Sequence, residues 1–222
     1  MTFYERLISE TTDERDAFLE IPLIQRTIRS GASRSLYLEF LSEAYHHVKH
    51  TVSLLALAVS RTTDERYQAA LIEYIGEEHG HEKWVLEDIT ALGGNAEDVR
   101  NGKPGISCQV MVGYAYYAIE RVSPYALLGS VHVLEGMSVL LADYVAEAMK
   151  QSLGLDNDRG LSYLKSHGSL DSEHITLFRS LVDGFEEHRT QQIIIENARI
   201  FYRLYGNIFQ DLGACREYSD AA

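Results

Sequence analysis

Apolar residues recur three and four positions apart in nearly every segment of this chain, and no run of β-branched residues alternates with polar ones. This spacing places apolar side chains on one face of an α-helix, because a helix turns once in about 3.6 residues. Three prolines interrupt the 222 residues. The sequence therefore predicts an all-α protein, long enough for one domain with a full core.

Capping and breaking residues divide the chain into about seven or eight expected helices. The Ile21-Pro22 step ends the first helix, and paired glycines after residue 92 end another. No repeat, linker or low-complexity tract separates the helices, so residues 1–222 are expected to form one domain. We expect helices over 2–19, 22–30, 34–60, 64–92, 106–122, 123–152, 158–187 and 190–212, with a loop over 95–105.

The charge of the chain excludes some partners. A formal net charge of −13, with scattered basic pairs, argues against nucleic acid and anionic membranes. The first residues lack the basic and apolar regions of a secretion signal, and the longest apolar stretch, 51–60, is too short to span a bilayer. Two cysteines without a CxxC pair are typical of a cytoplasmic protein with free thiols. We expect a small-molecule substrate.

Three expected helices carry residues that can bind a metal. In "HGSLDSEH" (167–174), two histidines and an aspartate fall within about 40° of one another on a helix. In 73–84, a glutamate and a histidine have the Glu-x-x-His spacing of carboxylate-bridged di-iron bundles. In 130–141, a glutamate stands among valines and leucines, where an unpartnered carboxylate is costly. The candidates are Glu78, His81, Glu135, His167, Asp171 and His174.

The chemistry of these six residues indicates a particular class of metal. Mixed imidazole and carboxylate ligands suit iron or manganese better than structural zinc, which prefers thiolates. Two metal ions would each receive about three protein ligands, because six candidates are available. Positions would then remain open for oxygen or substrate, as a catalytic site requires.

Each candidate also has a simpler interpretation. The "EEHGHEK" stretch and the 167–174 stripe could be solvated polar faces, and Glu135 could pair with an arginine such as Arg121. Glu77 is an alternative to Glu78, and His79 to His81, because neighbouring positions cannot face one site equally. The occurrence of ligand residues on three separate helices favours the metal site.

A second histidine cluster, "EAYHHVKH" (43–50), competes for a role in the site. Glu43 and His47 stand four residues apart, a spacing that allows either a ligand role or a place in the pocket wall. Tyrosines are typical core and cavity-lining residues, and several lie in this segment and in "YAYY". The possible pocket residues are Glu43, Tyr45, His47, Tyr114 and Tyr117.

The pattern resembles the haem-oxygenase-like diiron oxidases and oxygenases, the UndA- and CADD-like branch of the TenA/haem-oxygenase-like fold. The most specific match is His-x3-Asp-x2-His on a late helix, and the resemblance spans roughly 34–187. The family's glutamate on the preceding core helix matches Glu135, and its earlier glutamate and histidine match Glu78 and His81. Other members place that glutamate one or two turns earlier, where this chain has Tyr74 and Leu71.

The resemblance implies a single haem-oxygenase-like helical bundle that binds two Fe(II) ions, with Mn possible at one site and O2 as co-substrate. Glu78, His81 and His167 would hold one ion, and Glu135, Asp171 and His174 the other. A peroxo-diiron(III) intermediate would oxidise a small amino- or carboxylic-acid-type metabolite by C–C cleavage, desaturation or N-oxygenation. A homodimer is common on this fold.

Other activities of the fold match fewer residues. A TenA-like thiaminase or pyrimidine hydrolase needs a nucleophilic cysteine where this chain has Ser130, and an aspartate where it has Ala44. A haem oxygenase needs a glycine-rich distal helix, whereas this chain places the charged Glu135 there. A non-catalytic metal-binding helical bundle remains an alternative to the oxygenase.

Overall fold

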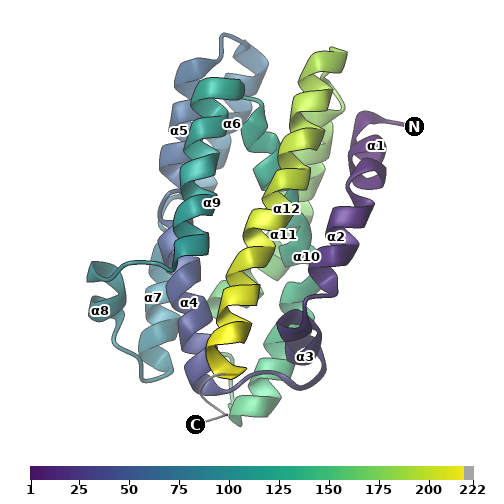
Figure 1. Cartoon of the computed structure of the whole chain (residues 1–222). Helices are drawn as coiled ribbons and strands as arrows, with labels where there is room; N and C mark the ends of the chain where they lie inside the picture. The colour runs from purple at the N-terminus through teal and green to yellow at the C-terminus, as the bar shows by residue number, and fades with distance from the viewer. Residues whose placement is uncertain (218–222) are drawn as a thin grey trace.

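The computed structural model describes the backbone of residues 1–217 and the side chains of residues 1–166 and 176–214. Within these residues the chain forms twelve α-helices and one π-helix, with no β-strand (Figure 1). The predicted all-α class is therefore confirmed. The α-helices are α1 (Phe3–Glu10), α2 (Thr12–Leu19), α3 (Pro22–Ser30), α4 (Arg34–Val48), α5 (Thr51–Arg61), α6 (Glu65–Glu78), α7 (His81–Ala91), α8 (Ala96–Asn101), α9 (Ile106–Tyr117), α10 (Ala126–Leu153), α11 (Ser162–Val182) and α12 (His188–Glu217), and the π-helix is Ala118–Val122.

The prediction of seven or eight helices was too low because local breaks divide several expected segments. The 2–19 segment breaks at Thr11, whose hydroxyl donates to the Leu7 carbonyl (2.8 Å). The 34–60 segment breaks at residues 49–50, and the 64–92 segment breaks at residues 79–80. In the second of these, Gly80 has a φ of +101°, a conformation that favours glycine.

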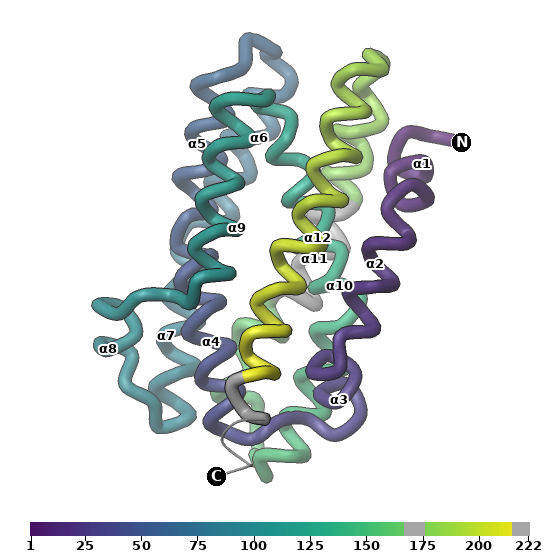
Figure 2. The backbone as a smooth tube through the Cα atoms, in the orientation of Figure 1, coloured from purple at the N-terminus to yellow at the C-terminus, as the bar shows by residue number. Residues whose placement is uncertain are grey.

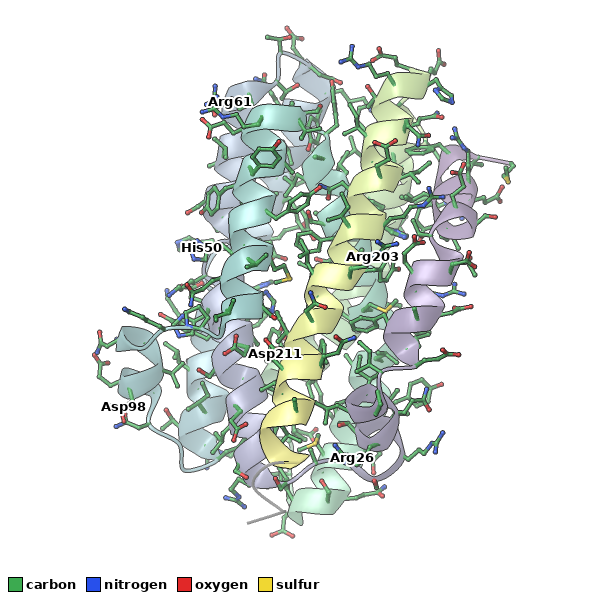
Figure 3. All side chains as sticks on the ribbon, viewed as in Figure 1. Arg26, His50, Arg61, Asp98, Arg203 and Asp211 are labelled. Carbon is green, nitrogen blue, oxygen red and sulfur yellow. The ribbon has the colours of Figure 1, made fainter. Side chains whose placement is uncertain are left out.

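Two further boundaries differ from the sequence prediction. The expected loop over 95–105 contains α8, because the Asn95 side chain accepts hydrogen bonds from the Glu97 and Asp98 amides (3.1 and 3.3 Å) and caps it. The expected 106–122 helix ends in the π-helix. Arg61, labelled at the end of α5 in Figure 3, donates to Glu120 of this π-helix (2.6 Å).

The helices surround a core formed by α10, α11 and α12. The helices α1, α2 and α3 follow one another down one side of the molecule, and α4 to α9 occupy the other side, as the backbone trace shows (Figure 2). Helix α10 packs against both α11 and α12, and α11 also packs against α7. Three of the helices that carry candidate metal ligands, α7, α10 and α11, are therefore linked by direct packing.

Helix α10 is buried because its sequence is apolar. Among the described residues it is the one helix long and apolar enough to cross a membrane, and half of its most apolar 18-residue window lies inside the structure. Residues 51–60, the apolar stretch considered from the sequence, are shorter than this window, so the sequence prediction did not identify α10 as the most apolar helix. Burial against α11 and α12 explains the apolar sequence of α10 without a membrane, since a core helix of a globular domain has the same composition.

The start of α11 is fixed by a carboxylate from another helix. Asp88 of α7 is 2% exposed, and its oxygens accept hydrogen bonds from the Ser162 amide (3.0 Å), the Ser162 hydroxyl (2.6 Å) and the Tyr163 amide (2.8 Å). A helix leaves its first amide groups without partners inside the helix, so Asp88 caps α11 from outside. This cap joins α7, which begins at His81, to α11, which carries three candidate ligands.

Candidate metal centre

Glu78 and His81 form a buried pair across the break between α6 and α7. Glu78 is the last residue of α6 and His81 is the first of α7, so they do not share one helix as the sequence suggested. The turn through Gly80 nevertheless brings His81 Nδ1 to 3.2 Å from Glu78 Oε2. Glu78 is 6% exposed and His81 is 5% exposed. The His81 ring also stacks on Trp84, with ring centroids 4.1 Å apart.

Burial distinguishes these two residues from their neighbours in the sequence. Glu77 and His79 are exposed, whereas Glu78 and His81 are buried. The interpretation of "EEHGHEK" as a fully solvated face therefore does not apply to Glu78 and His81. The structure places Glu78 and His81, rather than Glu77 and His79, inside the protein.

Glu135 enters the same region from α10. Its Oε1 accepts a hydrogen bond from the Tyr74 hydroxyl of α6, and the side chain is half-buried. Arg121, the salt-bridge partner considered from the sequence, is exposed on the π-helix. Tyr74 stands one turn before Glu78 on α6, so the hydrogen bond joins the helices that carry the two glutamates.

A cavity of about 80 Å³ lies between these helices, and both Glu78 and Glu135 line it. The described lining also includes Tyr74, Tyr163 and His47, together with apolar residues of α5 and α10. Two carboxylates at one small, largely apolar cavity are costly unless protons or a cation neutralise them. Carboxylate and imidazole donors around such a space suit iron, so these residues fit an iron site.

The structure places several cavity residues that the sequence analysis did not assign to the site. These are Tyr74, Tyr163 and Tyr205. Burial raises the pKa of Tyr163 well above its ordinary value, so its hydroxyl stays protonated and able to donate a hydrogen bond. Tyr163 stands four residues before His167, and Tyr74 four before Glu78, so helical spacing from the predicted ligands could have found both. Tyr205 carries no such signal, because α12 has no predicted ligand.

The five possible pocket residues occupy different places. His47 lines the cavity. Glu43 accepts a hydrogen bond from the Gly105 amide (2.9 Å) ahead of α9, and burial raises its pKa. Tyr45 packs edge-on against His46, with ring centroids 5.3 Å apart. The Tyr114 hydroxyl accepts from Asn197 (3.4 Å), and Tyr117 is 56% exposed. Among these five residues, His47 alone belongs to the cavity lining that the structure describes.

The remaining candidate ligands are His167, Asp171 and His174. They fall within α11, and their side chains lie outside the described residues. Among the residues whose side chains are described, no group of three or more metal-binding side chains occurs. Their assignment stays a prediction.

Ser130, at the position of the thiaminase nucleophile, is buried. Its hydroxyl donates to Asn197 Oδ1 (3.3 Å), and the residue lines the cavity beside Glu135.

The helical architecture defines a class of protein, the haem-oxygenase-like fold. The chain is similar to a domain of unknown function with a heme oxygenase-like fold from Shewanella denitrificans (TM-score 0.87, 23% identity, covering 97% of this chain and 93% of that one). It is also similar to haem oxygenase-1 from the cyanobacterium Synechocystis (TM-score 0.77, 11% identity, 100% and 96% covered). A TenA homologue from Pseudomonas syringae has a TM-score of 0.76 (13% identity, 95% and 92% covered).

Within that class, the chain belongs to the family of iron-containing redox enzymes, whose model matches residues 38–206. Membership indicates iron binding and oxidoreductase activity. The suspected relationship to the haem-oxygenase-like superfamily is confirmed. No curated protein matches the sequence.

Proposed function

We propose that the protein is a non-haem diiron oxidase or oxygenase that uses O2 to oxidise a small amino or carboxylic acid. The observation that carries this proposal is the cavity lined by Glu78 and Glu135, with His81 Nδ1 lying 3.2 Å from Glu78 Oε2. Membership in a family of iron-containing redox enzymes supports it. Helix α11 adjoins α7 and α10, which supports the assignment of its three predicted ligands to the same centre.

The residues of the proposed centre divide between two ions. Glu78, His81 and His167 would hold one, and Glu135, Asp171 and His174 the other. When bound, two ferrous ions supply electrons for the reduction of O2. Manganese at one position is compatible with the same donors.

Other side chains would prepare the cavity for this chemistry. The Tyr74 hydroxyl orients the Glu135 carboxylate by donating a hydrogen bond to Oε1. Tyr163 is buried and Tyr205 is partly buried at the cavity wall, and both rings exclude bulk water from it. His47 offers a further imidazole that could bind substrate at the wall.

Anaerobic titration with Fe(II) tests the proposal, with bound iron counted after removal of excess metal. We expect about two ions per chain and O2 consumption when the loaded protein is mixed with air-saturated buffer. Glu78→Gln and His81→Ala should reduce bound iron to about one ion or fewer. The exposed neighbours supply matched controls, since Glu77→Gln and His79→Ala should bind as much iron as the wild type. Equal iron in all four variants would overturn the assignment of these ligands.

The predicted ligands of α11 need their own test. His167→Ala and Asp171→Ala should each lower iron content while helical circular dichroism is unchanged. Unchanged iron in both variants would contradict the ligand set. Absence of iron from a correctly folded wild-type chain would instead favour a non-catalytic bundle.

We also propose that the enzyme acts in the cytoplasm as a homodimer. The two cysteines without a CxxC pair support the compartment. Light scattering of the purified protein would measure the mass of the assembly, and a mass of one chain, 25.1 kDa, would contradict the dimer.

A further inference from the structure

A second and larger cavity opens beside the proposed metal centre. It has a volume of about 410 Å³ and lies between α1–α2 and α10, with Phe178 of α11 and Tyr202 of α12 also lining it. We call it the α2–α10 groove. Glu135 lines both this groove and the smaller cavity, so the groove adjoins the proposed centre at this residue. Its volume lies in the range of small-molecule sites, about 300–1,000 Å³.

The mouth of the groove is apolar. Ile8, Val139, Leu140 and Tyr144 line it and are 36% to 67% exposed, although side chains of these types are usually buried. Exposed apolar side chains gathered at one cavity indicate a surface that binds an apolar body.

The deep end of the groove is lined by aromatic rings. Phe178 lies 6.2 Å between ring centroids from both Tyr4 and His132, and His132 lies 6.2 Å from Tyr202. Burial lowers the pKa of His132 to about 4, and its Nε2 lies 3.3 Å from the Thr11 hydroxyl, so this imidazole is neutral at pH 7. A wall of rings attracts an aromatic ligand more than an alkyl chain of equal area, because ring pairs in edge-on or offset geometry add to area burial.

One cation lies at this groove. Arg15 is the single lysine or arginine in the part of the lining that the structure describes. Its Nε and one amino group contact Asp16 Oδ1 (3.0 and 2.8 Å) in a partly exposed pair between adjacent residues. Exposed pairs of this kind contribute little, so Arg15 can exchange Asp16 for the carboxylate of a ligand.

The backbone beside Glu135 leaves space for the ligand. Gly136 lines the groove, and a Cβ atom at this position would meet nothing within 4 Å. A larger side chain at residue 136 would therefore extend into the groove, and its Cβ atom would clash with no neighbouring atom. Gly113 of α9 is a matched control, since a Cβ there also meets nothing within 4 Å and it does not belong to the described groove lining.

We propose that the α2–α10 groove binds an aromatic carboxylic acid, the substrate of the enzyme, with its ring on the Tyr4–His132–Phe178–Tyr202 wall and its carboxylate on Arg15. The proposal rests on the proposed function, since it names the substrate class of that centre. An acid bound in this way occupies the groove that Glu135 lines, and so lies next to the proposed metal site.

Calorimetric titration of the full chain tests the proposal, with and without Fe(II) under anaerobic conditions. The probes are 3-phenylpropanoate, its neutral amide 3-phenylpropanamide, and octanoate as an aliphatic acid. We expect 3-phenylpropanoate to bind about fivefold or more tightly than the amide and more tightly than octanoate. Arg15→Gln should reduce the affinity for the acid to that for the amide. Arg203→Gln removes the same charge from α12, where Figure 3 labels it, and should leave the acid's affinity unchanged because Arg203 is exposed and is not in the described groove lining.

Gly136→Leu should abolish binding of all three probes, whereas Gly113→Leu should not. Equal affinities for acid and amide, or retained binding in Gly136→Leu, would overturn the proposal. Tighter binding of octanoate would overturn the aromatic preference.

Iron content separates this proposal from the proposed function. Probe binding by a chain that holds no iron would support the groove and reject the diiron centre. Normal iron loading without probe binding would reject the groove and leave the diiron centre standing.

Discussion

Asp88→Ala tests whether α7 fixes the start of α11. The substitution removes the acceptor of three hydrogen bonds from Ser162 and Tyr163, at distances of 2.6 to 3.0 Å. Loss of a helix cap costs about 0.5–2 kcal/mol, and a buried donor without an acceptor costs about 1–3 kcal/mol. Together these effects should lower the free energy of unfolding by about 3 kcal/mol. For a chain of 222 residues, this corresponds to a Tm lower by about 6–12 °C.

Differential scanning calorimetry at pH 7 measures this change. Asp158→Ala is the control, because Asp158 also bonds to α11, through Lys165 (2.6 Å), but is an exposed surface partner. It should melt close to the wild type. A Tm for Asp88→Ala within about 1 °C of the wild type would refute the capping role.

The pH dependence of Asp88 gives an independent check of the same site. Burial raises the pKa of this carboxyl, although the hydrogen bonds from Ser162 and Tyr163 oppose the shift. Because the folded-state pKa is the higher one, the folded protein binds the proton more tightly than the unfolded chain. The stability that protonated Asp88 contributes is present at low pH and is lost as the pH rises through its folded-state pKa. Compared with Asp88→Asn, the wild type should gain stability between pH 7 and pH 4, and an unchanged difference in Tm would contradict this.

Three further substitutions test other parts of the fold. Burial lowers the pKa of His132 to about 4, so the neutral imidazole contributes about 3 kcal/mol to stability, and this contribution is lost as the pH falls from about 6.5 to 4. Urea unfolding at several pH values should therefore show a smaller loss of stability over this range in His132→Gln than in the wild type. Gly80 has a φ of +101°, so Gly80→Ala should cost about 1–2 kcal/mol and reduce bound iron by displacing His81, measured by thermal melting and by iron counting. A Cβ at Gly129 would lie 2.6 Å from the Ile194 carbonyl oxygen, so Gly129→Ala should lower Tm by several degrees, whereas Gly136→Ala, with nothing within 4 Å, should not.

The sequence predicted the all-α class and the start of most helices because these depend on local patterns. Asp64 caps α6 at the predicted start of this helix, with its carboxylate accepting from the Tyr67 amide (3.0 Å). The break at residues 49–50 was missed, because Lys49 and His50 carry no helix-ending signal. The break at Gly80 was missed although a glycine marks it, since an isolated glycine inside a helical pattern is usually tolerated.

Contacts between segments far apart in the chain could not be predicted from the sequence. Asp88 lies 74 positions before Ser162, and no pattern in either segment indicates that one caps the other. The hydrogen bond from Tyr74 to Glu135 likewise joins helices 61 positions apart. Glu78 could be proposed for the site from its Glu-x-x-His spacing and Glu135 from its apolar neighbours in the sequence, and both of these signals are local. Tyr205 lines the cavity because α12 packs against α10, and this packing could not be read from the sequence.

The break at Gly80 sets how Glu78 and His81 approach one another. Within a regular helix, residues three apart lie side by side on the surface, and both side chains point away from the axis. Here the helix is broken between them at His79 and Gly80, so the end of α6 and the start of α7 supply one residue each to a buried pair. The position of His81 therefore depends on the angle between two helices. Asp88, two turns later on α7, bonds to α11, and so the same short helix relates His81 to the helix of the remaining predicted ligands.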